Sequence, residues 1–222
     1  MNEKVPVKHV TITSEIQQYV VGSGLVQDDV LRWIVERTQE LGRPAIQQIV
    51  PEEGALLTLL TGLTEARFAV EVGTFTGYSS LCIARGLAEG GTLLCCDNSE
   101  EWTRVAREAW RKAGVEDRIT LELASATETI RALPREEHID FSFIDADLRN
   151  HAEYFDELIV RTRRNGVIVI DNTLLRGRVA HRERDEDAEM VHAFNERLLG
   201  DDRIESVLLP FHDGVTVVRK VG

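Results

Sequence analysis

Oxygen-bearing side chains follow two apolar runs of the sequence. Asp145 and Asp147 end the run FSFIDAD, and Asp171 and Asn172 end the run VIVIDN. If both runs are parallel strands of one sheet, their carboxyl ends bring these side chains together. Carboxylate and amide oxygens are hard ligands that suit Mg²⁺ or Ca²⁺ and suit zinc or copper poorly. The pattern predicts a divalent-cation site formed by Asp145, Asp171 and Asn172; the alternative is that these residues only solvate the ends of strands.

A second group of residues, EVGTFTG at Glu71 to Gly77, indicates a cofactor-binding turn. A dinucleotide fingerprint has the spacing G-x-G-x-x-G. Here the spacing is G-x-x-x-G, and Glu71 lies two residues before Gly73, where its charge disfavours a phosphate. Asp97 ends a further apolar run, where a carboxylate can accept hydrogen bonds from both ribose hydroxyls. A nucleoside without phosphate fits this set, and S-adenosylmethionine has the ribose diol and a sulfonium cation that tolerates nearby acids; the alternative is a purely structural turn.

These residues are positioned by an alternation of short apolar runs and longer amphipathic stretches after residue 66. Such an alternation is typical of parallel strands connected by helices. Strands are predicted over 67–72, 92–97, 119–124, 139–145 and 166–171, and helices over 77–89, 100–113, 125–133 and 151–164. Two last runs, 205–211 and 215–220, flank a short gap that contains Asp-Gly, which predicts an antiparallel hairpin.

The segment before residue 66 has a purely helical pattern. Helices are predicted over 14–21, 28–41 and 52–62, and we expect them to cap one edge of the sheet. The charged stretch 182–189 is interpreted as the solvated face that leads into a helix over 190–199. The expected organisation is one α/β domain over 1–222, with a helical N-terminal cap (1–65) and a cofactor-binding core (66–222).

Composition narrows the class of protein. The 222 residues carry 26 Lys and Arg against 38 Asp and Glu, a formal net charge of −12. Such an acidic body repels nucleic-acid backbones and anionic lipid, so neither is an expected partner. No run of residues resembles a membrane span or a signal peptide, which predicts a cytoplasmic protein. Cys82, Cys95 and Cys96 fit neither a disulfide framework nor a zinc motif and are predicted to be reduced core residues.

Together these motifs resemble the cation-dependent, S-adenosylmethionine-dependent O-methyltransferases of the caffeoyl-CoA and catechol type. The resemblance covers nearly the whole chain, from IQQIVPEEG through EVGTFTGYSS, FIDAD and GVIVIDNTLLRGRV to DGVTVVRK. It implies a Rossmann-like sheet of seven mostly parallel strands with an antiparallel last strand and helices on both faces, and it implies a homodimer. It also implies metal ligation by Asp145, Asp171 and Asn172, an acceptor contact at Arg176, and cofactor contacts at Val50, Glu71, Gly73, Thr74, Ser79, Asp97, Ala126 and Asp147.

The expected activity is transfer of a methyl group from S-adenosylmethionine to one hydroxyl of an ortho-diphenol. Mg²⁺, or another hard divalent cation such as Mn²⁺ or Ca²⁺, is the expected second cofactor, and natural-product biosynthesis is one expected setting. The alternative is a catalytically impaired cofactor-binding dimer with a regulatory or structural role. Retention of all three metal ligands argues against that alternative, since a pure binding module has no use for an open coordination site.

Two positions depart from the family pattern. Leu148 stands where the family has a lysine that takes or stabilises the phenol proton, and His151 stands where a tyrosine is common. Either the metal alone suffices or the acceptor differs. Asp145 and His151 are the candidate catalytic residues, while Arg149 and His181 are further candidates whose positions are more typical of solvated side chains.

Overall fold

Seven strands form one sheet in the part of the chain that the computed structural model describes, residues 11–24 and 27–222. Their order across the sheet is β3-β2-β1-β4-β5-β7-β6. Pairing is parallel from β3 through β5, whereas β7 is antiparallel to both β5 and β6. The strands are β1 (Phe68–Val72), β2 (Thr92–Asp97), β3 (Ile119–Leu123), β4 (Ile139–Ile144), β5 (Thr162–Ile170), β6 (Ile204–Leu209) and β7 (Val215–Lys220). The predicted mostly parallel sheet with an antiparallel last strand is confirmed.

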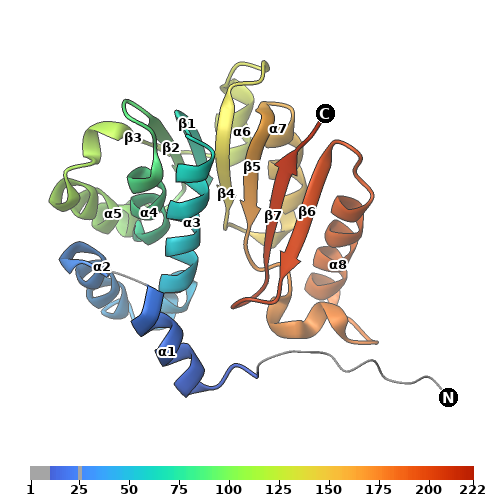
Figure 1. Ribbon diagram of the computed structural model, residues 1–222, viewed down its shortest axis with the longest axis horizontal. Helices are drawn as coiled ribbons and strands as arrows, with labels where there is room; N and C mark the ends of the chain where they lie inside the picture. The colour runs from blue at the N-terminus through green and yellow to red at the C-terminus, as the bar shows by residue number, and fades with distance from the viewer. Residues whose placement is uncertain (1–10, 25–26) are drawn as a thin grey trace.

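Helices cover both faces of this sheet (Figure 1). They are α1 (Ser14–Gly24), α2 (Asp29–Gln39), α3 (Pro51–Leu63), α4 (Tyr78–Gly86), α5 (Glu100–Ala113), α6 (Ala126–Ala132), α7 (His151–Ile159) and α8 (Glu186–Leu199). Helices α3, α4 and α5 pack on one face, and α6, α7 and α8 pack on the other. Successive residues of a strand point to opposite faces of the sheet. Phe143 therefore packs in the core beneath α3 and α4, and Ile144 packs in the core beneath α7. No helix of the described residues is long and apolar enough to cross a membrane.

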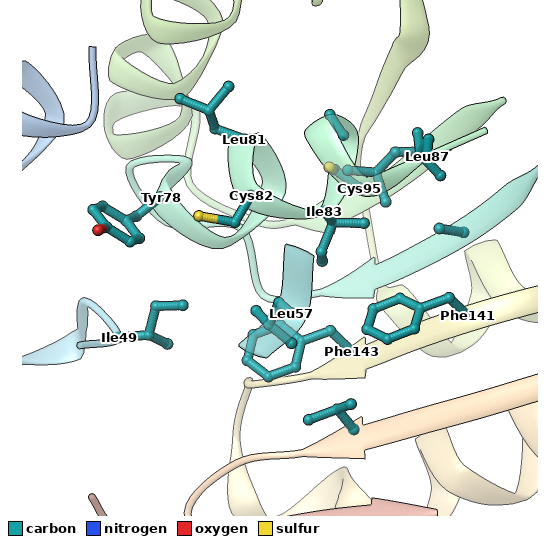
Figure 2. Close-up of a cluster of buried hydrophobic side chains, with 14 of the residues drawn as sticks. Ile49, Leu57, Tyr78, Leu81, Cys82, Ile83, Leu87, Cys95, Phe141 and Phe143 are labelled. Atoms are coloured by element: carbon teal, nitrogen blue, oxygen red, sulfur yellow. The ribbon is translucent and has the colours of Figure 1, made fainter. Parts of the chain in front are cut away.

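Helix α3 differs from its expected place at an edge of the sheet. It lies over a face, against α4, and Leu57 packs near Phe143 of the central strand β4 (Figure 2). The reason is the buried stripe of α3, which includes Glu53, Leu57 and Thr61 at helical spacing. This placement brings the first turn of α3 to the carboxyl ends of the strands.

The boundary between α7 and β5 was also predicted wrongly. The helix ends at Ile159 rather than at 164, and β5 begins at Thr162. Pairing of β4 with β5 shifts register between Ile139 and Phe141, so the residues around Asn165 bulge out of the ladder, with Asn165 at φ 63°. Asn165 and Gly166, which directly follow the predicted helix, belong to this bulge. The three cysteines are free and buried, as predicted.

Candidate active site

A cleft of about 740 Å³ opens at the carboxyl ends of the central strands. A volume of this size is typical of small-molecule sites. The cleft brings together most of the residues predicted from the sequence: Gly73, Thr74, Ser79, Asp97, Ala126, Asp145, Asp147, Asp171, Asn172 and Arg176. Parallel strands explain this convergence, because β1, β2, β4 and β5 all end at the same edge.

The turn after β1 requires its first glycine. Gly73 has φ +90°, and a Cβ built there would lie 2.0 Å from the backbone oxygen of Asp145. The turn therefore passes directly over the end of β4, in contact with the backbone of a predicted metal ligand. Gly77, at φ +87°, ends the turn and precedes α4, where a Cβ would lie 2.6 Å from Cβ of Ala106.

Asp97 holds the same turn from β2. Its Oδ2 accepts hydrogen bonds from the backbone nitrogens of Thr74 at 2.9 Å and Phe75 at 2.8 Å. Its Oδ1 accepts one from the nitrogen of Ser99 at 2.8 Å. A carboxylate has about four lone-pair sites, so these three bonds leave about one site for a ribose hydroxyl rather than the two that the sequence analysis predicts. Asp97 thus has a structural role that its position in the sequence did not predict.

Aromatic residues that the sequence analysis left out also line the cleft. Phe75 and Trp102 meet edge to face beside Asp97, with ring centroids 5.0 Å apart and an angle of 80°. The hydroxyl of Tyr154 donates to Oδ2 of Asp147 at 2.8 Å. The signal for Trp102 was weak, because it lies in the first turn of a strongly amphipathic helix whose exposed positions resemble an ordinary surface.

Two carboxylates that line the cleft, Asp145 and Asp171, lie close to a third, Glu53, which does not line it. Glu53, from the first turn of α3, is fully buried, and neither of its carboxylate oxygens has a hydrogen-bond partner. Burial raises the pKa of Glu53, and the charges of Asp171 and Asp145 raise it further. Burial likewise raises the pKa of Asp145 and of Asp171, and the Asp171 charge adds to the rise at Asp145. Among the described residues, no lysine or arginine forms an ion pair with any of the three.

This arrangement fits a divalent cation. Buried acids of like charge cannot all ionise unless a positive charge lies between them. Asp171 is tied to its neighbour, since its Oδ1 accepts from the backbone nitrogen of Asn172 at 2.6 Å and its Oδ2 accepts from Nδ2 at 3.1 Å. Because its amide nitrogen is used in this way, the amide oxygen of Asn172 is the atom of this side chain that can coordinate a cation. Glu53 lies within the PEEG motif, yet sequence reasoning gave it no role, because its approach to Asp171 depends on the packing of α3.

Two predicted cofactor residues lie behind the cleft. Val50 caps α3 directly after Gln48 and Ile49, which do line it. Glu71 is fully buried in β1. Burial raises the pKa of Glu71 to about 7, and neither of its carboxylate oxygens has a hydrogen-bond partner among the described residues. Neither side chain is among those that line the cavity.

His151 is not brought to the cleft. Its side chain is 2% exposed, its Nε2 lies 3.4 Å from the backbone oxygen of Ala146, and its ring meets that of Phe194 at 6.3 Å between centroids. His151 and Phe155 are one turn apart on the face of α7 that packs on α8. Burial lowers the pKa of His151 to about 4. The predicted catalytic role of His151 therefore lacks the geometry that a proton acceptor needs.

Other residues occupy the acceptor side of the cleft. Leu148 and Arg176 line it, and Arg176 is exposed at φ 53°. The backbone nitrogen of Arg176 donates to the carboxylate of Asp213. His212, which lies in the short gap between the last two predicted strands and was given no role there, also lines the cleft.

Comparison with known proteins places the chain in a family. A family model described as O-methyltransferase matches residues 23–221. The chain belongs to the O-methyltransferase family. It is 32% identical over 217 residues to "Probable caffeoyl-CoA O-methyltransferase 2" of Dictyostelium discoideum, covering 96% of this chain and 94% of that protein.

Solved structures agree with this assignment. The O-methyltransferase TomG of Streptomyces achromogenes, in complex with SAM, has a TM-score of 0.85 and 27% identity, covering 94% of this chain and 96% of TomG. A Bacillus cereus O-methyltransferase in complex with SAH has a TM-score of 0.83 and 27% identity, covering 93% and 97% of the two chains. The prediction of an S-adenosylmethionine-dependent O-methyltransferase of the caffeoyl-CoA and catechol type is confirmed at the level of the family.

Proposed function

We propose that this O-methyltransferase is cation-dependent and moves the methyl group of S-adenosylmethionine to one hydroxyl of a catechol-type small molecule. The observation that carries the proposal is the group formed by the buried Glu53 and Asp171 and the half-buried Asp145, with which no lysine or arginine of the described residues forms an ion pair. Asp145 and Asp171 line the same cleft as the turn after β1. Burying ionised carboxylates close together has a large unfavourable free energy unless a cation binds between them. The alternative of a catalytically impaired cofactor-binding dimer gains no support, because cofactor binding alone does not explain why these carboxylates lie close together.

The residues of the cleft divide into two groups. Asp145, Asp171 and Asn172 would hold a hard divalent cation such as Mg²⁺, Mn²⁺ or Ca²⁺. The cofactor would lie along Gly73, Thr74, Ser79, Asp97, Ala126 and Asp147, with Val50 and Glu71 supporting the wall from behind. When bound, the cation would orient both acceptor oxygens and lower the pKa of the reacting hydroxyl.

Alignment is the main contribution of the chain to the reaction. In the transfer, a new bond from oxygen to the methyl carbon forms as the bond from sulfur to that carbon breaks, and the hydroxyl proton passes to water. Opposite charges on sulfonium and phenolate cancel along this path, so proximity and orientation dominate. Arg176 at the rim and Leu148 on the wall would contact the acceptor, which makes this side of the cleft partly apolar.

The setting of the reaction is part of the proposal. TomG, which is similar to this chain over 94% of its length, is described as involved in Tomaymycin synthesis. We infer that this chain likewise modifies an aromatic intermediate of a natural product. We also infer a homodimer, which the family resemblance implies, and a cytoplasmic location, which the sequence analysis predicts.

The direct test uses purified protein, S-adenosylmethionine, Mg²⁺ and a panel of ortho-diphenols. We expect a product one methyl group heavier by mass spectrometry and no product in the presence of EDTA. The matched acceptors are the corresponding monophenols, which cannot chelate a cation through two oxygens and should react much more slowly. Binding of the cofactor with no product from any diphenol would favour the impaired dimer instead.

Asp97 gives a prediction about cofactor affinity. Asp97→Ala removes a charged acceptor from the cofactor site, and such hydrogen bonds contribute about 1.5–3 kcal/mol. We expect the dissociation constant for S-adenosylmethionine, measured by calorimetry, to rise at least tenfold. Asp97→Asn retains one oxygen that can accept from the backbone nitrogens of Thr74 and Phe75. This variant therefore distinguishes loss of the ribose contact from loss of the turn. If both variants keep the wild-type affinity, Asp97 does not bind the cofactor.

Leu148 and His151 give a prediction about the base. If the bound cation suffices, Leu148→Lys changes the rate by much less than the ~10²–10⁴ of a general base. The rate should rise with pH and level off, with no limb near ~6.5 from a histidine. His151→Ala should leave the shape of this profile unchanged, because the ring lies outside the cleft. A gain of two orders of magnitude in Leu148→Lys at neutral pH would show that the native site lacks a base it needs.

A further inference from the structure

His212 lies beside the proposed cation site. A nitrogen of its ring and one carboxylate oxygen each from Glu53 and Asp171 all lie within 4.8 Å of one another. Two ligands on opposite sides of a cation, with bonds of about 2.0–2.2 Å, are about 4–4.4 Å apart. Small side-chain movements would therefore place all three donors around one ion.

The backbone fixes His212 at this position. The nitrogen of Leu174 donates to the oxygen of Asp213 at 2.8 Å, and the nitrogen of Thr173 donates to the oxygen of Gly214 at 2.9 Å. These bonds tie the turn between β6 and β7 to Thr173 and Leu174, which directly follow the predicted metal ligands Asp171 and Asn172 after the end of β5. His212 itself has φ 49°, a conformation that non-glycine residues rarely adopt and that clusters at functional sites.

Glu53 supplies the independent observation that a ligand belongs here. Its side chain is fully buried, both carboxylate oxygens lack a partner among the described residues, and one of them lies within 4.8 Å of a carboxylate oxygen of Asp171. A carboxyl group in this position is satisfied only by a proton donor or a cation, and none of the described residues donates to it.

We propose that His212 contributes a nitrogen ligand, and Glu53 an oxygen ligand, to the same cation as Asp171. This inference rests on the proposed function and specifies its metal. Imidazole nitrogen suits first-row transition metals, whereas Mg²⁺ and Ca²⁺ take oxygen ligands almost exclusively. The preferred ion is therefore Mn²⁺ or a later first-row divalent metal rather than Mg²⁺.

The test loads the full chain with Mn²⁺ and records pulsed EPR spectra, which detect a directly coordinated ¹⁴N. We expect the imidazole nitrogen signal in the wild type, its loss in His212→Ala, and its retention in His181→Ala. His181 is a suitable control because it is exposed and does not line the cleft. His212→Ala should weaken Mn²⁺ binding by about tenfold or more and Mg²⁺ binding much less. Glu53→Gln, which is nearly isosteric, should weaken binding of both ions.

The outcomes separate this inference from the proposed function. Suppose that Mn²⁺ binds to the wild type and that Asp171→Ala abolishes this binding, but that the wild type shows no ¹⁴N coupling. The proposed cation site would then be supported, and His212 would not be one of its ligands. A ¹⁴N coupling that persists in His212→Ala would also show that His212 is not the nitrogen ligand. Unchanged affinity for both ions in Glu53→Gln would remove Glu53 from the ligand set. If Asp171→Ala leaves Mn²⁺ affinity unchanged, both the inference and the proposed cation site fail.

Discussion

Asp171→Ala is expected to reduce methyl transfer by about three orders of magnitude or more. Loss of a cation that polarises the acceptor costs several kcal/mol of transition-state stabilisation, and each 1.36 kcal/mol is about tenfold in rate. Affinity for S-adenosylmethionine should change little, because the turn after β1 is held by Asp97 and not by Asp171. Steady-state kinetics with saturating Mg²⁺ or Mn²⁺, together with calorimetry of cofactor binding, measure both quantities.

Stability provides a second readout of the same variant. In the absence of metal, Asp171→Ala relieves the repulsion that raises the pKa of Glu53, so its thermal midpoint should not fall much below that of the wild type. Added metal should raise the midpoint of the wild type and not that of the variant. Asp202→Ala, in the exposed turn before β6, is the matched control and should respond to metal like the wild type. Full wild-type turnover in excess EDTA would refute metal dependence.

Strand ends were the part of the site that the sequence predicted well. The runs before Asp97, Asp145 and Asp171 are short, apolar and separated by amphipathic helices, so their parallel direction follows from pattern and connectivity. Once the strands are parallel, the residues after them must share one edge. The cleft accordingly gathers these three acids without any further knowledge of tertiary packing.

Residues outside the strand ends escaped prediction for physical reasons. Glu53 reaches the site only because α3 packs on a face of the sheet, and His212 only because the last hairpin is bonded to the loop after β5. Both placements are contacts between segments far apart in the sequence. His151 is the converse case, since its separation from Asp145 in the chain is short but the face of α7 on which it lies packs on α8. Sequence proximity to a ligand does not decide which way a helical side chain points.

Gly73→Ala is expected to have the largest effect on stability. A left-handed backbone costs an alanine about 1–2 kcal/mol. Overpacking against the oxygen of Asp145, where the Cβ would lie at 2.0 Å, adds about 1–3 kcal/mol. The unfolding free energy should fall by about 2–5 kcal/mol, which lowers the thermal midpoint of a domain this size by roughly 10 °C. Because the clash is with the backbone of a predicted metal ligand, cofactor and metal affinity should weaken together.

Gly90→Ala separates the clash from the backbone strain. Gly90 lies in the turn before β2 with φ +71°, and a Cβ there would have nothing within 4 Å. Only the conformational cost of about 1–2 kcal/mol applies to it. We expect Gly90→Ala to bind cofactor and metal like the wild type, with a thermal midpoint lowered by roughly 4 °C. Equal thermal midpoints for the two variants would mean that the turn after β1 does not press against the end of β4. The prediction that the cofactor turn and Asp145 depend on each other for their positions would then be wrong.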